Sequence, residues 1–320
     1  MDELVQPFDM VTVFGGATLD RIARTAGPPV MGASNPGTVA RLPGGVGFNV
    51  ASILARLGLH ARLVTRVGAD SDGETVIAAA RDAGIDTTAF GVSPTAATAG
   101  YHAVFDDAGN LVIGVADMKV CDEITPAALA ELALVRHDRD FWVVDANLPA
   151  ETLAFLAEEA NAAGRPIAAL TVSPAKAVRI APLLDRLSYL FTNRREAAAL
   201  LGRDPNAQMN VADLASALAG PRLTKVVVTN GAEPLAAASG GDVRSFAAFR
   251  ASVKGVNGAG DSFAAGTIHG LAGGLALNDA IRFGLAAAAL TLESGSIAAG
   301  AFAKGALAAR IGAATRRIAS

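Results

Sequence analysis

The chain has few of the residues that build disulfides, metal sites or membrane spans. Cys121 is its one cysteine in 320 residues, which excludes an internal disulfide and a cysteine-based zinc site. The longest apolar run, 283–292, is too short and too rich in alanine to cross a bilayer, and the N-terminus lacks the regions of a signal peptide. No metal-ligand spacing occurs among the histidines, which are His60, His102, His137 and His269. We therefore expect a soluble, cytoplasmic protein.

An excess of one charge sign is also missing. The 27 Lys and Arg residues are scattered and stand against 30 Asp and Glu residues, a formal net charge of −3, so we expect no nucleic-acid partner. A Walker-type phosphate loop is absent, and neither glycine-rich stretch completes a dinucleotide-binding fingerprint. With 52% hydrophobic residues and no visible linker, residues 1–320 are expected to form a single domain.

One of the two glycine-rich stretches lies near the C-terminus, at 257–263, with the sequence Asn-Gly-Ala-Gly-Asp-Ser-Phe. Glycines just before a helix let an anion approach the free N–H groups of the first turn, so Gly258, Ala259 and Gly260 are predicted to form an anion hole. A carboxylate repels phosphate, and Asp261 beside this hole makes sense as a general base for an attacking hydroxyl. The alternative is a glycine turn with Asp261 as a helix cap.

The other glycine-rich stretch, Pro-Gly-Gly-Val-Gly-Phe-Asn at 43–49, precedes apolar residues at helical spacing. Gly44 and Gly45 would let a small polar ligand lie against the backbone. Asn49 offers both a donor and an acceptor, which suits sugar hydroxyls.

These two stretches, in this order and at this separation, resemble the paired signatures of the PfkB, or ribokinase-like, carbohydrate kinases, and the resemblance covers nearly the whole chain. Further stretches resemble the pseudouridine kinases of that family: Ser34–Gly37, Ala116–Met118, Asp145–Asn147 and Thr291–Ser294. The resemblance implies an ATP- and Mg²⁺-dependent kinase that phosphorylates the 5′-hydroxyl of pseudouridine. Ribose, a ketohexose or a standard nucleoside is the alternative acceptor, and a non-catalytic sugar sensor is a further possibility that Asp261 and its glycines disfavour.

The resemblance also implies roles for residues outside the two stretches. Glu196, in an Asn-x-x-Glu element, would act on Mg²⁺ through its water shell; from the residues alone we would expect it to be exposed on a helix. The ATP side would comprise Asn193, Thr229, Gly231, Gly258 and Gly260. The substrate side would comprise Asp20, Ser34, Asn35, Gly44, Gly45, Asn49, Asp117, Asn147 and Asp261. A loop-capping role for Asp20 and an ordinary loop position for Asp117, Ser34 and Asn35 are the alternatives.

Strand and helix patterns alternate along the chain. Buried strands are expected at 11–14, 62–67, 141–144, 166–170, 187–191 and 225–228, and Ser71-x-x-Glu74 has the form of a capping box. This alternation predicts an α/β fold with a mostly parallel central sheet and helices on both faces. Segments 28–42 and 88–115 carry short extended runs with turn signals and predict a small β flap. In ribokinase-like enzymes such a flap is a lid, which implies a homodimer through the lid.

Two departures from the family pattern concern the cation and the middle of the sheet. Gly255 and Val256 stand where ribokinases carry the Asp-Thr of a monovalent-cation site, so K⁺ dependence is left open. Leu170 and Thr171 replace an Asp-Pro pair, whereas Ser173 and Lys176 match the pseudouridine kinases. Lys176 is expected to be solvated.

Overall fold

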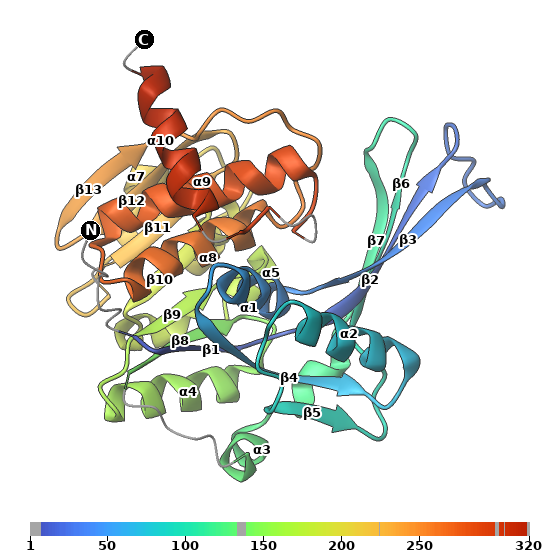
Figure 1. Ribbon diagram of the computed structural model, residues 1–320, viewed down its shortest axis with the longest axis horizontal. Coiled ribbons are helices and arrows are strands. Elements are labelled where there is room, and N and C mark those ends of the chain that lie inside the picture. The colour runs from blue at the N-terminus through green and yellow to red at the C-terminus, as the bar shows by residue number, and fades with distance from the viewer. Residues whose placement is uncertain (1–7, 133–138, 224, 298–300, 304, 319–320) are drawn as a thin grey trace.

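The computed structural model describes residues 8–132, 139–223, 225–297, 301–303 and 305–318 (Figure 1). Its strands form a nine-stranded sheet in the order β13-β12-β11-β10-β9-β8-β1-β4-β5 and a four-stranded sheet in the order β3-β2-β6-β7. The strands of the large sheet are β1 (Met10–Phe14), β4 (His60–Gly68), β5 (Phe90–Ser93), β8 (Asp140–Asp145), β9 (Ile167–Leu170), β10 (Tyr189–Asn193), β11 (Lys225–Asn230), β12 (Glu233–Ser239) and β13 (Asp242–Phe246).

The large sheet is mostly parallel, as the alternation predicts. Every neighbouring pair from β5 to β11 is parallel, and the antiparallel strands β12 and β13 close one edge. All residues of β1 and β8 are buried, because helices cover both faces of the sheet. The strands expected from the sequence are all present, with ends within two residues of the expected ones.

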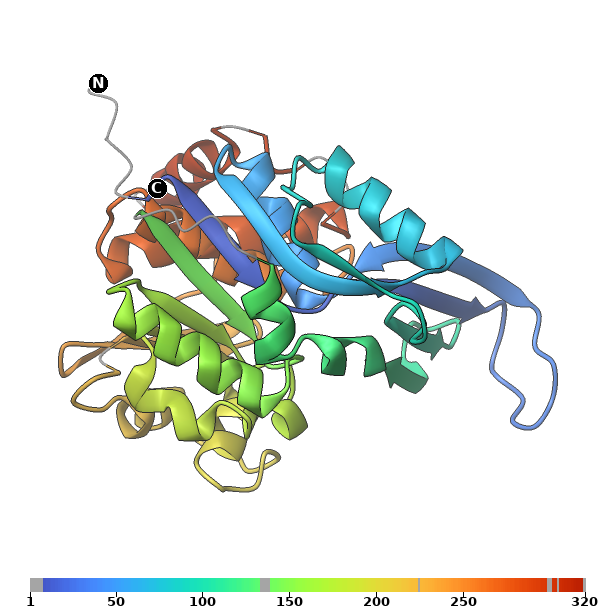
Figure 2. The same ribbon diagram turned by 90° about the horizontal axis from the view of Figure 1, so that it is seen from below.

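The helices lie in two layers on either side of the large sheet (Figure 2). One layer shares a core with Val11 and Val13 of β1 and contains α1 (Val46–Arg56), α2 (Ser71–Asp82), α8 (Ala259–Ala272), α9 (Leu277–Ser294) and α10 (Ala306–Ile318). The other layer packs on Phe14 and contains α3 (Pro126–Glu131), α4 (Ala150–Ala162), α5 (Pro174–Ala177), α6 (Arg194–Leu200) and α7 (Val211–Leu218), with 3₁₀ segments at Lys119–Glu123 and Ala181–Arg186. None of the described helices is long and apolar enough to cross a membrane.

Small residues allow α8 and α9 to pack closely. A Cβ at Gly266 would lie 2.6 Å from the Phe283 carbonyl oxygen, and one at Gly284 would lie 2.6 Å from the Phe263 carbonyl oxygen. Close backbone packing of this kind fixes the position of α8, whose first turn carries Asp261.

The small sheet projects from the large one (Figure 1) and consists of β2 (Thr18–Thr25), β3 (Gly37–Gly44), β6 (Gly100–Phe105) and β7 (Leu111–Asp117). Its boundaries differ from the expected segments 28–42 and 88–115. β5 pairs with β4 in the large sheet, because this short strand continues the β-α-β pattern after α2. β2 pairs with both β3 and β6 and so belongs to the small sheet. We refer to β2, β3, β6 and β7 as the lid.

The capping box expected at Ser71 is wrong by one residue. Asp70 is the N-cap of α2, and its Oδ1 accepts a hydrogen bond of 2.8 Å from the Gly73 N–H. The same side chain accepts from the backbone N–H and the hydroxyl of Thr98, a residue far along the chain. Because this long-range partner holds Asp70, the local Ser-x-x-Glu pattern does not decide the start of the helix.

Candidate functional site

The first turn of α8 needs glycine at its start. Gly258 is the N-cap with a φ of 76°, and a Cβ there would lie 2.4 Å from the Ile297 side chain. A Cβ at Gly260 would meet no atom within 4 Å, so this backbone faces open space. The Ala259 nitrogen lies 3.4 Å from the Val256 carbonyl oxygen, so this hydrogen bond is long and weak. The turn can therefore offer its N–H groups to an anion, as expected for Gly258, Ala259 and Gly260.

Asp261 lies on this turn and meets the second glycine-led helix. The Asn49 amide of α1 donates a hydrogen bond of 2.7 Å to Asp261 Oδ2. Burial raises the pKa of Asp261 to about 6; the Asn49 bond opposes this shift, and the carboxylates of Asp145, Glu196 and Asp20 add to it. A carboxyl group with this pKa is half ionised near pH 6 and can accept a proton at neutral pH.

Gly44 and Gly45 bring α1 against the turn that follows β1. Gly45 has a φ of 90°, and a Cβ there would lie 2.6 Å from the Gly16 carbonyl oxygen. A Cβ at Gly44 would lie 2.6 Å from an Asp20 carboxylate oxygen. Asp20 is in β2, rather than in a loop, and accepts a hydrogen bond from the Tyr101 N–H at 3.2 Å. Burial raises its pKa.

Asn147 joins this group from the end of β8. It is 4% exposed, and a Cβ at Gly16 would lie 3.1 Å from its amide nitrogen. The buried Asp145 carboxylate accepts from the N–H groups of Gly16 and Asn147, at 2.9 and 2.8 Å, and so ties the ends of β1 and β8 together. The Lys176 ammonium donates to the Asn147 side-chain oxygen. Our expectation of a solvated Lys176 is wrong: burial lowers its pKa, and it faces the site.

Asn193 and Glu196 lie at the junction of β10 and α6. They form a capping box in which the Asn193 side-chain oxygen accepts from the Glu196 N–H at 3.0 Å and the Asn193 backbone N–H donates to Glu196 Oε2 at 3.2 Å. The Asn193 side-chain amide also donates to Glu196 Oε1 at 2.6 Å. Glu196 is 7% exposed, so the expectation of an exposed position is wrong. Its Oε2 also accepts from the buried Thr171 hydroxyl at the end of β9. No sequence pattern signalled this contact.

A magnesium ion would find oxygen donors rather than a protein cage here. Glu196 and Asn193 present carboxylate and amide oxygens, the ligand class that Mg²⁺ prefers. In the part of the chain that the structure describes, no group of three or more His, Cys, Asp or Glu residues could hold a metal. These donors fit an ion that keeps several waters and is held mainly by substrate phosphates.

Thr229 and Gly231 lie at the end of β11, next to β10. The Thr229 hydroxyl donates to the Thr192 carbonyl oxygen at 3.3 Å. Gly231 has a φ of 63° in the β11–β12 turn, where a Cβ would meet no atom within 4 Å. Together with Asp145 and Glu196, these residues follow the carboxyl ends of neighbouring parallel strands, the edge at which α/β sheets bind ligands.

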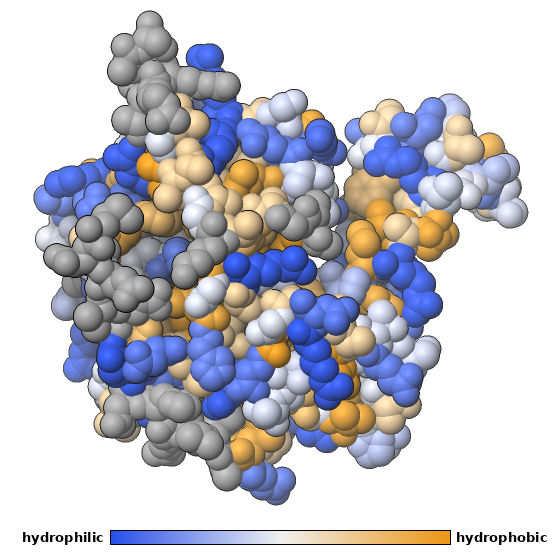
Figure 3. Space-filling model, in the orientation of Figure 1, coloured by the Kyte–Doolittle hydropathy of each residue, from blue (hydrophilic) through white to orange (hydrophobic). Residues whose placement is uncertain are grey.

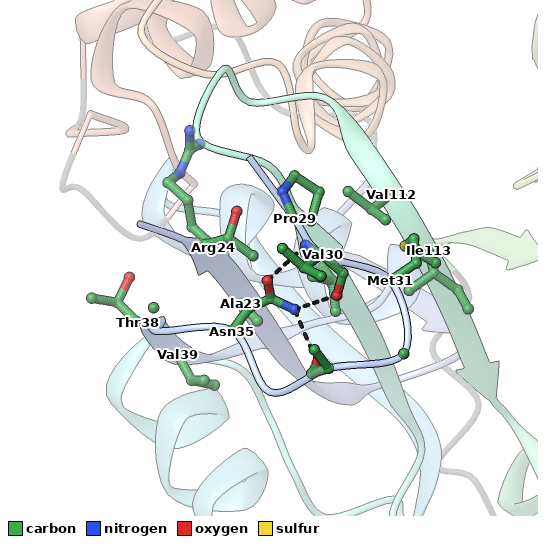
Figure 4. Close-up of a pocket in the computed structure, with 15 residues that line it drawn as sticks. Ala23, Arg24, Pro29, Val30, Met31, Asn35, Thr38, Val39, Val112 and Ile113 are labelled. Atoms are coloured by element: carbon green, nitrogen blue, oxygen red, sulfur yellow. Dashed lines mark hydrogen bonds between the residues drawn. The ribbon is translucent and has the colours of Figure 1, made fainter. Parts of the chain in front are cut away.

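Three further predicted substrate residues lie on the lid or in its β2–β3 loop. Asp117 is exposed at the end of β7 and accepts from the Lys119 N–H at 3.3 Å; the next residue, Met118, packs against Gly16. Ser34 and Asn35 lie in the β2–β3 loop, at the far end of the lid from α8 (Figure 2). The Asn35 side chain bonds to the backbone of Val30 and Ala33, as Figure 4 shows. The structure does not bring Ser34 and Asn35 to the other residues, and their assignment stays a prediction.

Comparisons with known proteins agree with this architecture. The profile of the pfkB family carbohydrate kinases matches residues 9–301. Pseudouridine kinase of Escherichia coli (strain K12) is 28% identical over 286 residues, which cover 89% of this chain and 91% of that protein. Ribokinase of Bacillus subtilis (strain 168) is 25% identical over 285 residues, covering 89% and 93% of the two chains.

Solved structures of similar proteins share the fold over nearly the whole length. A carbohydrate kinase from Agrobacterium tumefaciens is 36% identical, with a TM-score of 0.82 and coverage of 95% of this chain and 97% of that one. Arabidopsis thaliana ribokinase, solved as a complex with ribose and ATP, is 20% identical, with a TM-score of 0.80 and coverage of 95% and 99%. The large sheet, its two helical layers and the separate small sheet are therefore a ribokinase fold.

Proposed function

Because this chain belongs to the pfkB family of carbohydrate kinases, which are phosphotransferases that act on hydroxyl groups, we propose that it phosphorylates the 5′-hydroxyl of pseudouridine with ATP. The observation that carries the proposal is the contact between Asn49 and Asp261. It joins a partly buried carboxylate at the start of α8, with a pKa raised to about 6, to the glycine-led start of α1.

In the proposed reaction the 5′-hydroxyl oxygen attacks the γ-phosphorus of ATP. Its proton passes to the Asp261 carboxylate, and the bond from the γ-phosphorus to the bridging oxygen breaks, which releases ADP. The N–H groups of Gly258, Ala259 and Gly260 would stabilise the negative charge on the transferred group. Their place at the N-terminus of the fourteen-residue helix α8 supports this role.

We propose that Glu196 acts on Mg²⁺ through its water shell, with Asn193 beside it and with Thr229 and Gly231 on the nucleotide side. A bound Mg²⁺ would neutralise charge on the phosphates. The buried Glu196 carboxylate lies close enough to raise the pKa of Asp261, which supports a shared site. At Gly255 a Cβ would lie 2.8 Å from the Gly295 carbonyl oxygen, so the aspartate of the ribokinase cation site would not fit there, and K⁺ dependence is left open.

The acceptor would lie among Asp20, Gly44, Gly45, Asn49 and Asn147. Paired carboxylate and amide groups suit the hydroxyls of a ribosyl ring. Asp117 would accept N–H bonds from the uracil ring as the lid closes. Ser34 and Asn35, in the β2–β3 loop of the lid, are also proposed to bind the substrate.

Pseudouridine is favoured over other acceptors by the similarity to a pseudouridine kinase over 89% of this chain. Ribose, a ketohexose, uridine and adenosine are the alternatives, since several ribokinases are also similar. Purified protein with Mg-ATP should be assayed against pseudouridine, uridine, adenosine, ribose and fructose, with the phosphorylated position determined by NMR. We expect the highest kcat/KM for pseudouridine. No preference for it would contradict the substrate assignment and leave the kinase assignment standing.

An Asp261→Asn variant is the matched control for the assay. Loss of the general base should lower kcat by roughly 10²- to 10⁴-fold with every acceptor while ATP binding persists. Near-normal turnover would refute Asp261 as the base.

We also propose a homodimer formed through the lid, in a reducing cytoplasm. Exposed apolar side chains gather on the lid strands and the β2–β3 loop, and Figure 3 shows hydrophobic residues on this projecting part. They are Val30, Met31, Val39, Leu42, Leu111, Ile113 and Val115. A cavity of about 390 Å³ lies between that loop and the lid strands, away from Asp261 (Figure 4). An apolar surface of this kind is typical of an interface. The single, buried Cys121 fits a reducing compartment.

A further inference from the structure

The Glu196 carboxylate has both local and distant hydrogen-bond partners. Asn193 supplies the local ones, since its amide donates to Oε1 and its backbone N–H donates to Oε2 at 3.2 Å. Any Asn-x-x-Glu at a helix start can make these bonds. Thr171 supplies the distant partner: it directly follows β9, and its hydroxyl donates a hydrogen bond to Glu196 Oε2. Only the Thr171 contact depends on the tertiary structure of the site.

The Thr171 hydroxyl is held where the carboxylate is its best acceptor. The residue is 1% exposed, and its hydroxyl lies 3.0 Å from the Thr192 hydroxyl and 3.4 Å from the Phe191 carbonyl oxygen. A hydroxyl has one proton to donate, and a charged carboxylate attracts it more strongly than the neutral oxygens do. The proton therefore points to Glu196.

A strained turn follows Thr171 directly. Val172 has a φ of 65°, the one positive φ of a non-glycine residue in the described ranges, and the Ser173 N–H donates to the Thr171 carbonyl oxygen at 2.7 Å. This three-residue turn is unfavourable for a β-branched side chain. Pro174 restricts Ser173 to its extended conformation, with a φ of −160°, before α5 begins. Strain of this kind persists where the surroundings require it, and here it accompanies the approach of Thr171 to α6.

We propose that Thr171 is a positioning residue whose hydroxyl fixes the Glu196 carboxylate in the orientation that acts on hydrated Mg²⁺. The inference rests on the proposed kinase function. Outer partners of this type orient metal-acting carboxylates, and their loss weakens metal binding. If Thr171 instead serves only to satisfy a buried carboxylate, its removal would lower stability and leave metal dependence unchanged.

The test compares Thr171→Val, which removes the hydroxyl at similar volume, with Thr171→Ser, which keeps it. Thr192→Val is the matched control, since it removes a neighbouring buried hydroxyl that has no bond to Glu196 in the described structure. Isothermal titration calorimetry would measure ADP binding with and without Mg²⁺, alongside thermal unfolding of each metal-free variant. We expect Thr171→Val to lower the Mg²⁺-dependent gain in ADP affinity by about tenfold. Thr171→Ser and Thr192→Val should retain it, and metal-free ADP binding should not change.

Two outcomes would overturn the proposal: a full Mg²⁺-dependent gain in Thr171→Val, or an equal loss in Thr192→Val. Thr171→Ala replaces the valine variant if that variant does not fold, because alanine adds no new contact. Glu196→Gln separates this inference from the proposed function. If that variant also keeps the gain, the metal role of Glu196 fails; if it loses the gain while Thr171→Val does not, only the positioning role fails.

Discussion

At the scale of single residues, Asp261 as the proposed general base would connect catalysis with stability. Its raised pKa means that folding costs free energy whenever the carboxyl group is ionised, since the folded state holds the proton more tightly than the unfolded chain does. The cost is absent below about pH 4 and is complete once the pH exceeds the folded pKa of about 6. The group proposed as the general base is therefore expected to make the fold less stable at neutral pH.

Asp261→Asn should consequently be more stable than the wild type at pH 8, by roughly 1–3 kcal/mol. At pH 4 the two proteins should differ little, because both side chains are neutral in the folded state. Urea unfolding at the two pH values measures this difference. Equal stability of the two proteins at pH 8 would show that the folded state does not destabilise the ionised carboxylate.

Asn49 is expected to set the acid limb of the pH profile. Its amide stabilises the ionised form of Asp261, so Asn49→Ala should raise the Asp261 pKa further. With Asp261 as the proposed general base, activity would require the ionised form and would fall as the pH drops through this pKa. The limb of kcat/KM against pH should therefore move upward by roughly one pH unit. An unmoved limb would mean that another group controls the profile.

At the scale of structural elements, an ion-pair cluster joins the lid to α2, which covers the large sheet. Arg21 of β2 and Arg41 of β3 are register partners, and each bonds a different oxygen of Asp72 in the first turn of α2. The Asp72 side chain is 17% exposed, so the pairs are only partly screened by solvent. We expect this cluster to bias the lid toward the orientation seen here.

Asp72→Asn should therefore change the acceptor KM severalfold while kcat stays within about twofold, because it alters lid position and not the reacting groups. High salt should move the wild-type KM in the same direction and leave the variant unchanged. Glu158→Gln, which removes the exposed Glu158–Arg186 pair, is the control. A salt response in Asp72→Asn equal to the wild type would contradict the role of the cluster.

At the scale of the whole molecule, the sequence predicted the mostly parallel sheet, six of its nine strands and the two glycine-led helix starts, whereas β5 was assigned to the flap and β12 and β13 were not expected. Buried strands and helix-opening glycines are local patterns that a single segment carries. The expectations that are wrong concern the exposure of Glu196, the exposure of Lys176 and the capping role of Ser71. Glu196 is buried and accepts a hydrogen bond from Thr171, and Lys176 donates to the side chain of Asn147 in the site. Asp70, and not Ser71, caps α2, because Thr98 bonds to the Asp70 side chain. Each depends on a partner from a distant part of the chain, which no local pattern contains.

The exposed apolar face of the lid predicts that two molecules assemble into a dimer. Val39, Ala23, Val104 and Ile113 are paired in register across the four strands of the lid, so they share one face of that sheet. Val39 and Ile113 are 68% and 55% exposed in the single chain. Exposure of apolar side chains to water is unfavourable in free energy, and packing against a second lid would bury them.

Ile113→Lys should therefore convert a dimer to a monomer in size-exclusion chromatography with light scattering. The buried charge would have no partner at a face shared by two identical lids. Val243→Lys, at an exposed valine on β13 of the large sheet, should remain dimeric. If the wild type is monomeric at micromolar concentration, or if the β13 variant dissociates equally, the lid does not form the interface.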